Sequence, residues 1–251
     1  MLRFLSKIRY RLASENKLTG YICYALGEIV LVVIGILIAL KVNNLNENRK
    51  LSITEHKALT NLQQDFLYNQ NHLTQLIARL DTIMEACLTV LAHTGKRYNS
   101  NSGFAIDSIL GMLATVAPFF PKNGFLDDLL NSGNLGIFKN DSLRQMLSSW
   151  KPSLEYLKER ENDLNIKSTQ IEDFISENGS WVNYDHNNDN LDFTMPESGS
   201  DIDNNRLLLL PEFENYVDNQ IFYINVQKER QVKSLRSTNE ILKSIENGLN
   251  K

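Results

Sequence analysis

The sequence predicts an all-α protein in which a single N-terminal transmembrane helix continues into an up-and-down bundle of long helices of the four-helix type. Three observations lead to this prediction. Residues 21–40 form an apolar run with one carboxylate, and apolar residues after residue 59 recur at helical spacing. The composition favours helices, because Gly and Pro number only 12 and 5 and runs of Val, Ile and Thr are few.

The chain of 251 residues suits one membrane segment and one extramembrane domain of ordinary size. We expect a basic amphipathic segment at 1–20, a transmembrane helix at 21–40, a helical stalk at 41–58 and a helical bundle at 59–251. A formal net charge of -4 lacks the basic excess that phosphate neutralisation requires, so nucleic acid is not an expected partner. Cys23 lies in the membrane run and Cys87 on an apolar helical stripe, so the two are not expected to pair.

The apolar run YICYALGEIVLVVIGILIAL at 21–40 has about the length that one helix needs to cross a bilayer. This run is longer than the apolar core of a signal peptide, and no small-residue cleavage site follows it. We therefore expect it to remain in the protein. Five basic residues precede it and four follow within the range that affects topology, which favours a cytoplasmic N-terminus. Residues 1–12 read either as a helix on an anionic lipid surface or as a charged flank that sets topology.

Glu28 interrupts the apolar run at a depth where an ionised carboxylate facing lipid is costly. Small and polar residues share its helical phase, so one face of the membrane helix carries Tyr21, Tyr24, Glu28, Gly35 and Ala39. This pattern is typical of a helix-packing face, either in a homo-oligomer or against another membrane protein. The alternatives are snorkelling of Glu28 towards the lipid headgroups and a role in conducting protons or ions.

The bundle is expected to begin with a long core helix. Apolar residues recur in steps of three and four over 59–90, and one polar residue, Asn69, lies in that stripe. A turn-rich segment follows at 95–103. Two short helices come next, one that stops at Pro118 and one with Asn123 as its N-cap.

Two further long helices complete the bundle. The first starts after Asn140 or Ser142, either of which suits its N-cap, and ends at Gly179. Residues 180–205 are polar and rich in turn formers, so we expect an irregular loop there. Pro211 opens the last helix, which is apolar at both ends and polar in its middle.

We expect the helices to alternate up, down, up and down, with 104–131 counted as one interrupted helix. This order buries every apolar stripe and needs only short connections. The loops at 95–103 and 180–210 then share the far end of the bundle, which is the natural surface for partners. Phe119 and Phe120, held between two prolines, are candidate distal docking residues. The alternative, favoured for paired aromatics beside a helix turn, is a cap on the bundle.

No catalytic signature is recognisable, so we expect no enzyme, no catalytic residue and no cofactor. The four histidines are far apart, and the zinc, Walker, GxSxG and dinucleotide-binding patterns are missing. One string matches an EF-hand calcium loop, with candidate ligands Asp201, Asp203, Asn205 and Glu212. Because Arg206 stands where that loop needs glycine, a solvated acidic loop is the expected state and a metal is not.

Three stretches of the chain look familiar: SENKLTGYICYALGEIVLVVIGILIALKVNNLNENRK, LLNSGNLGIFKNDSLRQML and PEFENYVDNQIFYIN. Together they resemble an uncharacterised family of single-pass, membrane-anchored helical proteins of Bacteroidota, a domain of unknown function. The string GEIVLVVIGILIAL, which contains Glu28 and Gly35, is the most specific part. The resemblance implies a protein of the bacterial inner membrane, and a cytoplasmic N-terminus then places the bundle in the periplasm. It supplies no activity.

The sequence therefore predicts a non-enzymatic, membrane-anchored accessory or assembly protein. Its partners are expected to be membrane lipid, a protein bound by the periplasmic bundle, and its own copies or another membrane protein bound through the membrane helix. The alternative is an extracytoplasmic bundle that senses a ligand and signals through its membrane helix. A polar, ligand-sized pocket would favour sensing, whereas a solid core with an adhesive end or seam would favour assembly.

Overall fold

A computed structural model describes residues 18–186 and 192–250, and no strand occurs among them. The all-α prediction is confirmed. Most of the basic segment at 1–20 lies outside the described residues, and so do the side chains of Tyr21 and Tyr24. The chain divides into two compact units, residues 1–57 and 58–251.

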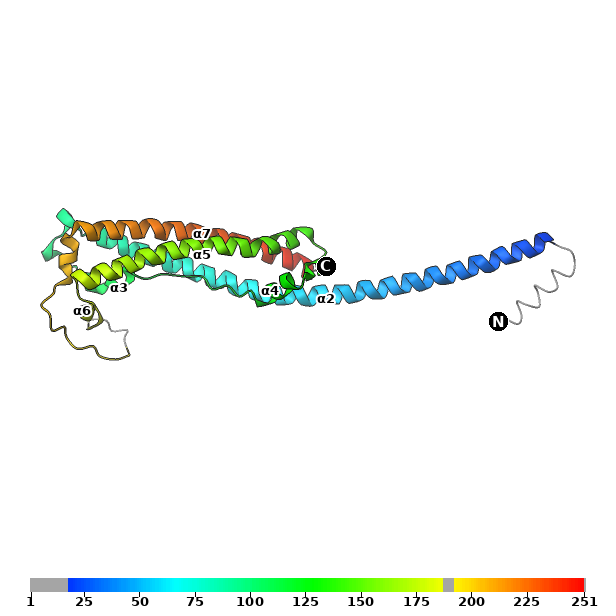
Figure 1. Cartoon of the computed structure of the whole chain (residues 1–251), viewed down its shortest axis with the longest axis horizontal. Helices are drawn as coiled ribbons and strands as arrows, with labels where there is room; N and C mark the ends of the chain where they lie inside the picture. Colours follow the sequence, from blue (N-terminus) through cyan, green and yellow to red (C-terminus); the bar gives the residue numbers. More distant parts are fainter. Residues whose placement is uncertain (1–17, 187–191, 251) are drawn as a thin grey trace. The chain divides into compact units, whose positions relative to one another are not determined.

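The first unit contains the start of one long helix, α2 (Leu18–Leu91), whose later turns belong to the second unit (Figure 1). An 18-residue window of this helix has a mean hydropathy of 2.5, and none of that window is buried in the chain. Among the described helices, α2 is the one long and apolar enough to cross a membrane. Helical backbone continues without a break through the expected stalk at 41–58.

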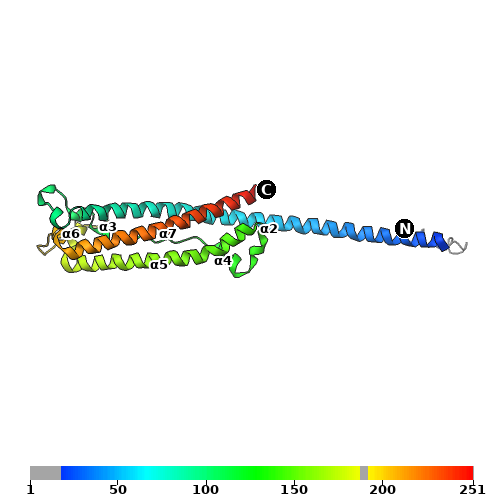
Figure 2. The same ribbon diagram turned by 90° about the horizontal axis from the view of Figure 1, so that it is seen from above.

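The second unit is built on three long helices: the turns of α2 from Ala58 onward, α5 (Asp141–Asn178) and α7 (Pro211–Leu249) (Figures 1 and 2). Side chains of all three form one apolar core. The helix α7 runs antiparallel to α2, because Gln70 on α2 donates to Asn239 at 2.7 Å while Asp81, further along α2, pairs with Lys228. These helices provide the expected up-and-down arrangement.

The ends of the long helices follow the predicted signals. Asn140, rather than Ser142, is the N-cap of α5, since its side-chain oxygen accepts a hydrogen bond from the Leu143 N–H at 3.2 Å. Gly179 is the C-cap of α5, and Pro211 occupies the first turn of α7, where its missing N–H costs nothing. Cys87 is free and buried, and burial raises the pKa of its thiol to about 12.

The segment 104–131, expected to form the fourth and interrupted helix of the bundle, differs from the expectation in one respect. The short helix expected to stop at Pro118 is already finished at the end of α3 (Leu110–Leu113), and the chain then runs without helix or strand over 115–123 before α4 (Gly124–Asn131). We call residues 115–123 the strap. Two prolines in the strap disfavour the helical conformation of the residues before them, so apolar spacing alone does not extend the helix.

Short elements gather at the end of the bundle where α2 finishes. They are η1 (Gly95–Arg97), η2 (Ser100–Ser102), η3 (Ile106–Ser108), α6 (Trp181–His186) and η5 (Asn204–Leu209), whereas η4 (Asn134–Ile137) precedes α5. The prediction that 180–205 is wholly irregular is wrong for α6. Ser180 caps this turn by accepting the Asn183 N–H at 3.2 Å, and Gly111 on α3 leaves room for Tyr184.

Candidate functional site

The strap lies among the three long helices and takes the place of a regular fourth helix (Figure 2). Two buried glutamines of α7 hold its first half. The side-chain amides of Gln227 and Gln231 donate to the same backbone carbonyl, that of Ala117, at 2.9 and 2.8 Å. Both amides bind a backbone atom, so the peptide groups of the strap help to hold it in place.

The other two long helices bind the second half of the strap in the same way. Asn69 on α2 accepts the Lys122 N–H at 2.7 Å and donates to the Lys122 carbonyl at 3.0 Å. Glu161 on α5 accepts the Phe119 N–H at 2.8 Å. Such bonds satisfy backbone groups that no neighbouring strand or helical turn satisfies.

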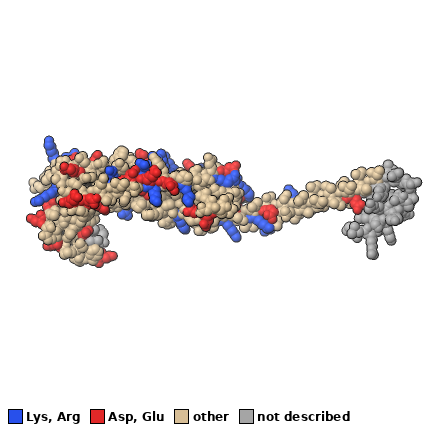
Figure 3. Space-filling view, viewed as in Figure 1, with Lys and Arg blue, Asp and Glu red and all other residues tan. Residues whose placement is uncertain are grey.

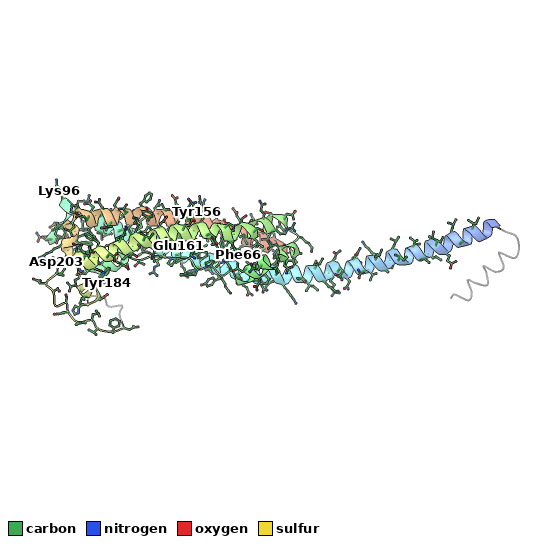
Figure 4. All side chains as sticks on the ribbon, viewed as in Figure 1. Phe66, Lys96, Tyr156, Glu161, Tyr184 and Asp203 are labelled. Carbon is green, nitrogen blue, oxygen red and sulfur yellow. The ribbon has the colours of Figure 1, made fainter. Side chains whose placement is uncertain are left out.

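Phe119 and Phe120 lie on opposite sides of the strap. Phe119 is 6% exposed and its ring centroid lies 5.5 Å from that of His72, whereas Phe120 is 71% exposed. Successive side chains of an extended chain point in opposite directions, so one residue packs inward and the other faces outward. Glu161, which accepts the Phe119 N–H, lies midway along the bundle, away from the end marked by Lys96 and Asp203 (Figure 4).

A groove of about 630 Å³ runs between the strap and α5. We call it the strap groove. Its lining consists of the strap residues Phe119, Phe120 and Pro121 and the α5 residues Lys151, Leu154, Glu155, Leu157, Lys158, Glu159, Glu161 and Asn162. Charges of both signs line the groove, and both signs also occur over the visible face of the bundle in Figure 3. An apolar edge with a mixed-charge wall suits contact with another protein surface.

Glu161 is the titratable group that the fold perturbs in this groove. Burial raises the pKa of its carboxyl above the usual range, and the hydrogen bond from Phe119, the Gln231 side chain and the positive charge of Lys158 offset part of that rise. The folded state therefore binds a proton at Glu161 more tightly than the unfolded chain does. Its contribution to stability is present at low pH and is lost as pH rises through its raised pKa.

Replacing Glu161 with glutamine is expected to flatten the pH dependence of stability. Glutamine keeps an oxygen that accepts the Phe119 N–H but does not ionise, so E161Q should gain stability relative to the wild type as pH rises from about 4 to 7. Urea unfolding at several pH values measures this difference. Glu155→Gln, an exposed neighbour on α5, controls for the loss of one carboxylate. A stability difference that stays constant with pH would contradict the assignment.

Side-chain oxygens of the calcium-like string accept hydrogen bonds from other groups of the protein. Asp203 accepts hydrogen bonds from the backbone and the side chain of Asn205, both at 2.9 Å, and Asn205 accepts the Ile106 N–H at 3.2 Å. Glu212 lies in the first turn of α7. In the described part of the chain, no group of three or more His, Cys, Asp or Glu residues is placed to hold a metal ion.

No described residue covers the described part of the expected membrane-helix face. Glu28, Gly35 and Ala39 are exposed on α2, and a Cβ added at Gly35 would meet no atom within 4 Å. This face is therefore open to lipid or to another helix.

Sequence reasoning missed the side chains that hold the strap, although their signal was present. Asn69 occupies a core position of an otherwise apolar stripe, and Gln227 and Gln231 fall on the buried face of α7. Polar residues at core positions indicate that a polar backbone runs beside them.

The strap and the whole strap groove lie in a part of the chain that matches a known family. Residues 28–188 match the profile of a family described as "Family of unknown function (DUF6090)", which is more than half of the chain. The chain belongs to DUF6090. The matched region begins at Glu28 and includes the strap and all of α5, so the resemblance to an uncharacterised domain family is confirmed. No curated protein and no solved structure gives a significant match to this DUF6090 chain.

Proposed function

We propose that this DUF6090 protein is a non-enzymatic accessory or assembly protein of the bacterial inner membrane. Its apolar helix anchors it with a cytoplasmic N-terminus, and its bundle binds a partner protein in the periplasm. The apolar window of α2 and the basic residues that precede it support the anchor and its orientation. The observation that carries the binding role is the strap groove with the exposed ring of Phe120 beside it.

The occupant that fits the strap groove best is an amphipathic helix of the partner. An extended strap is thinner than a helix, so it leaves one side of α5 without the neighbour that a four-helix bundle would supply. A partner helix would cover that side, place apolar residues against Phe120 and Leu154, and pair its charges with Lys158 and Glu155.

Substitution of two exposed phenylalanines, Phe120 and Phe222, tests this role. Full-length protein with Phe120→Asp should no longer recover the partner from solubilised native membranes, because a carboxylate is placed at the apolar edge of the groove. Phe222→Asp serves as the control, since Phe222 is 61% exposed on α7 and does not line the groove. Equal recovery of the same proteins by both variants would contradict a role for the groove.

We propose that the anchor also takes part in assembly. Glu28 lies on the same face of α2 as Gly35 and Ala39, and small residues allow close approach of a second helix. A carboxyl group in the apolar region is stabilised when it forms a hydrogen bond across such an interface. The partner helix is either a second copy of this chain or another membrane protein.

Replacing Glu28 with alanine is expected to reduce the size of the assembly extracted in mild detergent. The loss of the interhelical hydrogen bond removes on the order of 1 kcal/mol from the interface, or about fivefold in association. Light scattering coupled to size exclusion measures the particle mass. Val30→Ala, roughly on the opposite face, is the control. An unchanged mass for the Glu28 variant would rule out this packing role.

A further inference from the structure

A second, smaller pocket lies on the bundle between α5 and α7, outside the strap groove. It has a volume of about 100 Å³ and no acidic residue in its lining. The lining residues are Ser153, Tyr156, Leu157, Arg230, Lys233, Ser234 and Ser237. Two cationic side chains and four hydroxyl groups thus surround a space with the volume of about three water molecules.

Arg230 is held in place at this pocket without being neutralised. Its guanidinium carbon lies 4.4 Å from the ring centroid of Tyr156, and its Nη2 donates to the Tyr156 hydroxyl at 2.9 Å. Its Nε is buried and has no hydrogen-bond acceptor.

Positive charge at the pocket is not balanced by neighbouring carboxylates. Within the described residues, neither Arg230 nor Lys233 has a carboxylate within ion-pair distance. Arg160, which lies over the same Tyr156 ring at 5.5 Å, is by contrast paired with Asp163 at 2.9 Å. The pocket therefore has the charge that attracts an anion.

We propose that this pocket binds the phosphate group of a small phosphate monoester. A tetrahedral oxyanion matches its volume, its guanidinium donors and the hydroxyls of Ser234 and Ser237, whereas the Ser153 hydroxyl donates to the Trp150 carbonyl at 2.6 Å. Tyr156 marks the pocket on the bundle in Figure 4. The phosphate pocket shares one residue with the strap groove, the buried Leu157, and its proposed ligand does not depend on the proposed protein partner.

An adjoining pocket provides room for the rest of the ligand. It has a volume of about 280 Å³ and shares Ser153 and Ser237 with the phosphate pocket. Its other lining residues are Gln145, Met146, Ser149, Trp150, Glu240 and Ile241. The carboxylate of Glu240 disfavours a second anionic group there, so the ligand carries one phosphate and an uncharged or cationic remainder.

Calorimetric titration of the full-length protein in detergent with inorganic phosphate tests the proposal. The wild type should bind one phosphate, and Arg230→Gln should weaken binding about tenfold or more, because a hydrogen-bonded charge is removed. Arg236→Gln, on α7 but outside this pocket, should bind as the wild type does. Absence of binding to the wild type, or equal affinity in both variants, would overturn the site.

Two further measurements keep the test decisive. Lys233→Gln should also weaken phosphate binding, and it replaces Arg230→Gln if circular dichroism shows that the arginine variant is unfolded. Glycerol 3-phosphate in solution and phosphatidic acid in nanodiscs then separate a soluble ligand from a lipid headgroup. Tighter binding of either one than of inorganic phosphate supports the adjoining pocket, whereas weaker binding of both would refute its role.

Discussion

Trp150→Ala is expected to lower the free energy of unfolding of the bundle by about 3–5 kcal/mol. Trp150 on α5 is 1% exposed, and its ring centroid lies 5.2 Å from that of Phe66 on α2. Its indole N–H donates to the side chain of Asn123, at the end of the strap, at 2.9 Å. One side chain therefore connects two long helices and the strap, so its removal leaves a cavity and an unpaired acceptor.

Urea unfolding of the full-length protein, followed by far-UV circular dichroism, measures this loss. The second tryptophan provides a matched control, because Trp181 lies on the short helix α6 and is only partly buried. Trp181→Ala should cost clearly less than Trp150→Ala. A loss below about 1 kcal/mol for Trp150→Ala would be incompatible with a fully packed side chain.

Asn69→Ala is expected to be the most damaging change among the polar residues that hold the strap. It leaves both the N–H and the carbonyl of Lys122 without their partner, at a cost of about 1–3 kcal/mol for each backbone group. The strap should then open locally while the long helices stay folded, because their apolar core does not depend on Asn69.

Hydrogen exchange of the backbone amides distinguishes this local opening from global unfolding. Lys122 and Phe119 should exchange faster in Asn69→Ala than in the wild type, whereas amides in the middle of α5 should keep their protection. Asn71→Ala, an exposed position two residues further along α2, is the control. Unchanged exchange of the strap in Asn69→Ala would show that the amide does not hold it.

The long helices were predictable because their signals are local. Apolar spacing marks their buried faces, and Asn140, Gly179 and Pro211 mark their ends within one turn. The turn at α6 was missed because it depends on its cap, Ser180, and on the fit of Tyr184 beside Gly111, far away in the sequence. A single short turn in a polar segment carries too few apolar positions to show periodicity.

The candidate site was less predictable, because it is made of contacts that are distant in the sequence. Phe119 and Phe120 were recognised as notable residues, but only the fold separates the buried ring from the exposed one. Ala117 meets Gln227 across 110 positions of sequence. No local pattern reports such a contact, although Asn69 in an apolar stripe indicates that a polar partner is needed.

Site-specific photocrosslinking at position 120 in native membranes tests the binding role of the strap groove most directly. With a photoreactive residue in place of Phe120, we expect one discrete adduct with another protein, whose crosslinked peptide maps to an amphipathic helix. The same residue in place of Phe222, exposed but outside the groove, should give no such adduct. Recovery of the uncrosslinked chain alone, or of the same adduct from both positions, would contradict the proposal.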